Sequence, residues 1–180
     1  MRILWISDFC LEHTKGGAQR SDDIIINHGL NNNLDITWFN CDSDLNLLVE
    51  KYDHVISTNL ETISQKYPHI INWLQQPPNH SRLEHDMNAY LSPSDRQLLF
   101  ANCKNSFFLT HYHYELFKNS YGDFFKNVEI IQDPIDTNAF YNKEEKREDK
   151  VLYAGFMHLL KGTETFFNYV LNNPDTQFVV

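Results

Sequence analysis

Residues 1–9 read MRILWISDF, and residues 16–22 read GGAQRSD. The first stretch contains a short apolar run, residues 2–7, and the second opens with two glycines. An apolar run, a glycine turn and a helical segment over residues 18–28 together form the first half of a βαβ unit. The three consecutive isoleucines of that segment also suit a strand. The alternation of elements along the chain nevertheless favours a helix.

Further short apolar runs follow this start, separated by segments with helical patterning. They lie at residues 35–39, 54–57, 70–74, 105–110, 128–131, 151–154 and 177–180. Continuous apolar runs that alternate with helices are typical of strands buried on both faces of a parallel sheet. Ser92 followed by Pro93 predicts a helix start, and Gly122 predicts a helix end. We therefore predict an α/β fold, a Rossmann-like doubly wound parallel sheet with helices on both faces.

Two stretches interrupt this alternation. Residues 75–92 are long, polar and contain two prolines, which predicts a loop of functional interest. Residues 143–150 form a run of charged side chains, which predicts a solvated linker. The pattern of strand, turn, helix and strand then restarts. We expect a first domain over 1–142, a linker over 143–150 and the first βαβ unit of a second Rossmann-like domain over 151–180.

The composition excludes some classes of function. The chain has 24 acidic residues against 15 Lys and Arg, for a formal net charge of −9, which disfavours binding to nucleic acid. No apolar run reaches the roughly 20 residues of a membrane span, and the start does not read as a signal peptide. Cys10, Cys41 and Cys103 are widely spaced and read as reduced thiols. These features predict a soluble, cytoplasmic protein without a transmembrane segment.

Three features are candidates for ligand binding. Gly16 and Gly17 open a helix after the first strand, where exposed amides favour an anion such as phosphate, although a plain turn explains them equally well. Lys161 stands at the next strand-to-helix turn, where it either neutralises a diphosphate or lies in solvent. Asp8, at the end of the first strand, either binds ligand or caps the turn, and its location favours ligand.

Other polar residues have simpler explanations. Asp22 and Asp23 read as charges on the exposed or N-terminal part of a helix, where acids suit the helix dipole. His111 and His113 read as surface or partly packed histidines, because the sequence offers no further ligand at metal-site spacing. We expect no metal site.

Taken in order, several stretches resemble the large retaining family of GT-B glycosyltransferases over the whole chain. They are the two opening stretches, VEIIQDPIDTNAF at 128–140, the charged linker and VLYAGFMHLLKG at 151–162. The segment that begins LEHDMNAYLSPSD at residue 83 resembles a subset of these proteins, which carry Glu-His-Asp in a long loop.

The resemblance implies a hexose transferred with retention from a nucleotide sugar to a glycan or similar acceptor, without a metal and with no cofactor beyond that donor substrate. The first domain would hold the acceptor and the second the donor. Gly16, Gly17 and Lys161 would bind the donor diphosphate. Glu84, His85 and Asp86 would lie at the cleft mouth and orient sugar hydroxyls or the acceptor. None of these is expected to act as a general base.

The sequence also departs from this family. Phe156 stands where members usually carry an arginine paired with the lysine, and the sequence stops at Val180, before the family's two late glutamates. We therefore expect little or no transferase activity from the 180-residue chain. The alternative is an inactive truncated or split GT-B domain that binds a sugar or a partner protein, or that a second chain completes. A Rossmann oxidoreductase is disfavoured because the first turn lacks Gly-x-Gly-x-x-Gly.

Overall fold

The protein is described here by a computed structural model, which covers residues 1–8, 16–85, 92–135, 137, 150–154 and 162–179. The chain divides into two compact units, Met1–Thr137 and Asn138–Val180, and each is described by itself.

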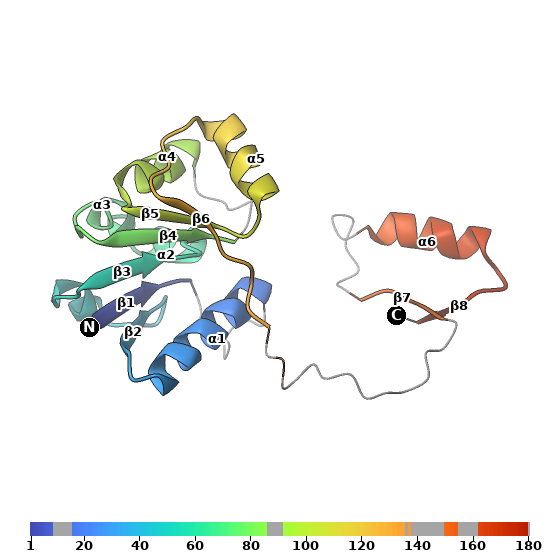
Figure 1. Ribbon diagram of the computed structural model, residues 1–180, viewed down its shortest axis with the longest axis horizontal. Helices are drawn as coiled ribbons and strands as arrows, with labels where there is room; N and C mark the ends of the chain where they lie inside the picture. Colours follow the sequence, from blue (N-terminus) through green and yellow to red (C-terminus); the bar gives the residue numbers. More distant parts are fainter. Residues whose placement is uncertain (9–15, 86–91, 136, 138–149, 155–161, 180) are drawn as a thin grey trace. The chain divides into compact units, whose positions relative to one another are not determined.

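The first unit is built on one six-stranded sheet (Figure 1). The strand order is β2-β1-β3-β4-β5-β6, and every neighbouring pair is parallel. The strands are β1 (Arg2–Ile6), β2 (Asp35–Phe39), β3 (His54–Ser57), β4 (His80–Glu84), β5 (Asn105–Phe108) and β6 (Val128–Ile130). Because the strands all run the same way, their carboxyl ends meet at one edge of the sheet. The expected α/β fold with a parallel sheet is confirmed.

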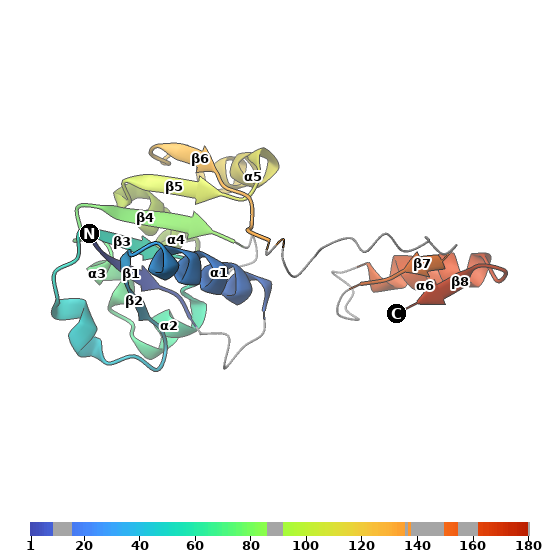
Figure 2. The same ribbon diagram turned by 60° about the horizontal axis from the view of Figure 1, so that its bottom comes forward.

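Helices cover both faces of this sheet (Figures 1 and 2). Helix α1 packs on one face through Ile26, which clusters with Trp5 and Leu83. The other face is covered by the short α2 and α3 and by α4 and α5, whose apolar residues cluster with Leu4 and Phe108. The helical elements of this unit are α1 (Gly17–Asn31), the 3-10 helix η1 (Leu45–Val49), α2 (Glu61–Lys66), α3 (Ile70–Trp73), α4 (Pro93–Asn102) and α5 (His111–Tyr121).

Three local predictions are confirmed. The segment over 18–28 is helical and belongs to α1. Ser92 caps α4, since its hydroxyl accepts a hydrogen bond from the Asp95 amide at 3.1 Å and Pro93 is the first helical residue. Gly122 ends α5 with φ 95°, a conformation that side chains with a Cβ rarely adopt.

The prediction for residues 70–84 is wrong in two ways. The apolar run over 70–74 forms helix α3 instead of a strand, and β4 lies inside the stretch predicted to be a loop. A short apolar run fits a buried helix as well as a strand. The polar β4 is fully buried because its side chains find partners, as His80 does with the Ser57 hydroxyl at 2.8 Å.

The second unit contains β7 (Lys150–Leu152), α6 (Thr163–Asn172) and β8 (Gln177–Val179). β7 and β8 pair in parallel, and α6 packs against them through rings such as Phe166, whose centroid lies 4.8 Å from that of Tyr153 and 5.8 Å from that of Phe178. This is a βαβ unit, as the sequence predicts. Among the described residues, no helix is long and apolar enough to cross a membrane.

Candidate functional site

The carboxyl edge of the six-stranded sheet carries a cluster of charged and polar side chains. Thr58 directly follows β3, and His85 directly follows β4. Asp22 reaches both from the second turn of α1. Its Oδ2 accepts a hydrogen bond from the Thr58 hydroxyl at 2.9 Å, and its Oδ1 lies 3.3 Å from His85 Nε2. Helix α1 is thereby tied to the ends of two central strands through a carboxylate that is fully buried.

His85 is held between two carboxylates. Asp22 faces Nε2, and Oδ1 of Asp133, beyond the end of β6, lies 3.3 Å from Nδ1. The Ser21 hydroxyl fixes Asp133 from α1 with a hydrogen bond of 2.9 Å. Burial lowers the pKa of His85, but the hydrogen bond and charge of Asp22 and the charges of Asp133 and Glu84 outweigh it, so the pKa is raised. The two carboxylates thus shift the imidazole toward its doubly protonated form, which donates hydrogen bonds from both ring nitrogens.

A second ion pair lies next to this histidine, on β4 itself. Arg82 Nη2 is 3.0 Å from Glu84 Oε2, and both side chains are at most 1% exposed. The other terminal nitrogen of Arg82, Nη1, donates to the Thr58 carbonyl. Oε1 of Glu84 is buried and has no hydrogen-bond partner among the described residues. A buried carboxylate oxygen without a donor is costly, so Oε1 is an unpaired acceptor inside this edge of the sheet.

Asp8 lies at the same edge and is 5% exposed. Its carboxylate accepts a hydrogen bond from the Ile63 amide at 2.9 Å, and the amides of Thr62 and Glu61 contribute as well. Burial nevertheless raises the pKa of Asp8. The structure shows Asp8 holding the first turn of α2, and its expected role in sugar binding stays a prediction.

The two glycines at the start of α1 are described in full. Gly16 is extended, with φ −83° and ψ 163°, and the first turn of α1 has neither a capping side chain from Gly16 nor an acidic residue. A Cβ added at Gly17 would meet no atom of the described residues within 4 Å. The first-turn amides of a helix favour an anion, and the open space at Gly17 leaves room for one. The expected role of both glycines stays a prediction.

The remaining predicted residues are not described. Asp86, Phe156 and Lys161 lie outside the described residues. Of the predicted set, the structure therefore brings Glu84 and His85 together at the carboxyl edge, where Asp8 also lies.

Sequence reasoning missed four members of this cluster: Asp22, Thr58, Arg82 and Asp133. Asp22 was predicted on the exposed or the N-terminal part of a helix; it lies in the N-terminal part of α1, but it is buried and not exposed. Asp22 lies one turn before the buried Ile26 on the inner face of α1, and this spacing was the available signal. Arg82 was placed in a polar loop instead of a strand, so nothing in the sequence marked it as buried.

The described residues contain no group of three or more His, Cys, Asp or Glu side chains that could hold a metal ion. Comparison with protein-family models, curated proteins and solved structures gave no match.

Proposed function

We propose that this chain contains the acceptor-side domain and the start of the donor-side domain of a retaining, metal-independent GT-B glycosyltransferase, which transfers a hexose from a nucleotide sugar to a glycan or similar acceptor. The observation that carries this proposal is the buried charged cluster at the carboxyl edge of a parallel sheet. Ligands of open α/β sheets bind outside that edge.

The cluster offers the groups that a sugar needs. On this proposal, sugar hydroxyls pair with the carboxylate of Glu84, whose Oε1 lacks a donor, and with the imidazole of His85, whose pKa is raised. On this proposal, Gly16 and Gly17 receive the donor diphosphate at the start of α1, and the expected part of Lys161 in binding a diphosphate stays a prediction of the sequence. The negative charge that develops on the leaving phosphate is stabilised by amides and a cation, so that no metal is required.

A second candidate function is a sugar- or protein-binding module without catalysis. It is favoured by the internal pairing of the cluster. Both ring nitrogens of His85 face carboxylates of the same chain, and Arg82 is already paired with Glu84. Groups engaged in this way stabilise the fold and leave less for a substrate.

The test places a charge where the diphosphate is expected. Gly17→Asp adds a carboxylate at the start of α1, where an acid suits the helix dipole and the fold has room for the new Cβ. Gly17→Ala is the matched neutral control. Isothermal titration calorimetry with UDP-glucose and GDP-mannose should show weak binding by the wild-type chain and by Gly17→Ala, and at least about tenfold weaker binding by Gly17→Asp.

Equal binding by all three proteins would contradict a diphosphate site at this turn. Binding of neutral glycans without any nucleotide-sugar binding would favour the module over the transferase. Consistent with the sequence analysis, we expect no detectable turnover of either nucleotide sugar by the isolated chain.

A further inference from the structure

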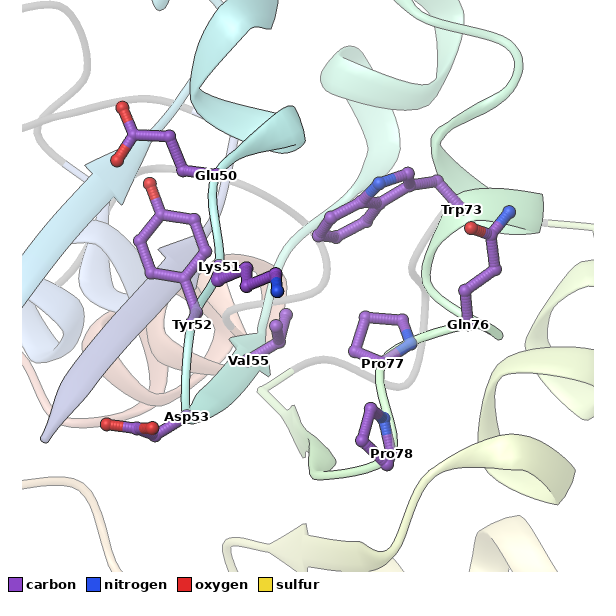
Figure 3. A pocket seen from close by; sticks show the side chains of 9 residues that line it. All are labelled: Glu50, Lys51, Tyr52, Asp53, Val55, Trp73, Gln76, Pro77 and Pro78. Atoms are coloured by element: carbon purple, nitrogen blue, oxygen red, sulfur yellow. The ribbon is translucent and has the colours of Figure 1, made fainter.

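A pocket of about 420 Å³ opens at the amino ends of β3 and β4, which is the sheet edge opposite to the charged cluster (Figure 3). One wall comes from the segment that leads into β3, and the other from α3 and the segment that leads into β4. A volume of this size falls in the range of small-molecule sites, roughly 300–1,000 Å³. The proposed function assigns no role to this edge.

The apolar part of the pocket is a flat ring on a fixed support. Trp73 stands on α3, is half-buried and packs against the main hydrophobic cluster. Its indole projects into the pocket, with the ring of Pro77 beside it and Val55 on the strand side (Figure 3). A tryptophan held by the core presents its face without a large loss of side-chain entropy, which suits stacking against the apolar face of another ring.

The acidic residues of the lining are already engaged. The Glu50 carboxylate lies 2.7 Å from Arg2 Nη2, and Asp53 accepts a hydrogen bond from the Arg2 amide at 2.8 Å. Both carboxylates point away from Trp73 (Figure 3). Their charges are therefore partly neutralised and are directed out of the pocket.

Lys51 supplies the positive charge. Its ammonium extends toward Trp73 and Pro77 (Figure 3), and within the described ranges it forms no ion pair with a carboxylate of the chain. At the rim, the exposed Gln76 offers an amide that both donates and accepts hydrogen bonds. The pocket thus combines a flat apolar surface, one cation and one amide.

We propose that this pocket binds an acidic sugar, with a hexuronate residue as the ligand class. The pyranose ring stacks on Trp73, its carboxylate pairs with Lys51 and its hydroxyls bind the Gln76 amide. A ring with hydroxyls suits this rim better than a purely apolar ring, because Lys51 and Gln76 are both exposed to solvent. The proposal does not depend on the glycosyltransferase function, since none of its residues belongs to the carboxyl-edge cluster.

The test uses two ligands that differ only in the carboxylate, methyl β-glucuronide and methyl β-glucoside. The readout is the indole N–H signal of Trp73 in two-dimensional NMR of the full chain. We expect a saturable shift of that signal with the glucuronide, while the signals of Trp5 and Trp38 stay in place. The glucoside should bind at least about tenfold more weakly, because it lacks the charge-assisted contact to Lys51.

Two variants assign the effect. Lys51→Gln should abolish the preference for the glucuronide, and Lys118→Gln, which removes an exposed lysine paired with Asp123, should preserve it. Equal affinity for the two glycosides, or no saturable shift with either, would overturn the proposal. Tighter binding of phenylacetate than of the glucuronide would also overturn it, because the pocket would then recognise an aromatic acid instead of a sugar.

Discussion

The two ends of β4 each carry a buried histidine, and neighbouring charges shift the pKa values of these two histidines in opposite directions. At the amino end, burial and the charge of Arg82 lower the pKa of His80 to about 3. At the carboxyl end, burial also opposes the charged form of His85, yet the hydrogen bond and charge of Asp22, aided by Asp133 and Glu84, raise its pKa. His80 is therefore neutral near pH 7 and bonded to a serine, whereas the carboxylates around His85 shift it toward the charged form.

This contrast separates structure from function within one strand. At the amino end of β4, the buried His80 is bonded to the Ser57 hydroxyl and carries no charge near pH 7. The carboxyl end keeps charges in a buried place, which costs free energy unless each is paired. Charges that are retained at the edge where α/β sheets bind ligands are a reason to look for function there.

The largest effect is expected when the buried pair of the carboxyl end is broken. Arg82→Met leaves Glu84 buried without its partner, and we expect the free energy of unfolding to fall by about 3–5 kcal/mol in urea denaturation. Replacing both residues with methionine should recover much of that loss, since no unpaired charge remains. A single variant as stable as the wild type would show that the pair is not buried in solution. Arg2→Gln, at an exposed ion pair, is the control and should cost far less.

His80, at the amino end of β4, should make the stability of the protein sensitive to acid. A histidine whose pKa is lowered by folding takes up its proton mainly in the unfolded state, so stability is lost as the pH falls below about 6.5. Through His80, the free energy of unfolding should fall by about 1.4 kcal/mol for each pH unit between about 6.5 and the pKa of His80 in the folded protein. In NMR titrations, the ring signals of His80 should stay unchanged between pH 8 and about pH 5. A midpoint near 6.5 would remove the contrast between the two ends.

A smaller effect is expected when either carboxylate beside His85 is neutralised, and the two variants should lower the pKa of His85 to different extents. Asp22→Asn keeps an acceptor for the Thr58 hydroxyl but removes the charge, and we expect the pKa of His85 to fall, because burial then meets less opposition. Asp133→Asn should lower it less, because that side chain is 48% exposed and its charge is screened by water.

The same variants have a consequence for stability. A raised folded pKa stabilises the protein below the unfolded value and loses that contribution as the pH rises through the folded value. The stability of the wild-type chain relative to Asp22→Asn should therefore be greatest below about pH 6.5 and decline above it. An opposite trend in urea denaturation would show that His85 is neutral between its two carboxylates.

The elements that sequence reasoning placed correctly are those whose apolar patterns are continuous. The strands over 35–39 and 54–57 have the expected bounds, and α1 was placed through the alternation of elements despite its isoleucines. β4 was missed because a strand that contains His80, Arg82 and Glu84 reads as polar. Such a strand is buried only when its polar groups find partners, here the Arg82–Glu84 pair within the strand and Ser57 and Thr58 more than 20 positions away.

The candidate site was partly predictable for the same reason. Glu84 and His85 stood out through a resemblance, whereas Asp22 was interpreted as a charge on the exposed or N-terminal part of a helix. What places Asp22 inside is a set of contacts to residues 36 and 63 positions away, Thr58 and His85. No local pattern encodes contacts of that range.

The measurement that bears most directly on the proposed carboxyl-edge site is amide shift mapping by NMR on the whole chain, with UDP-glucose and a panel of neutral oligosaccharides. The account predicts that ligand-dependent shifts concentrate at Gly16, Gly17, Glu84 and His85. Shifts confined to other parts of the chain, or none with any ligand of the panel, would contradict it.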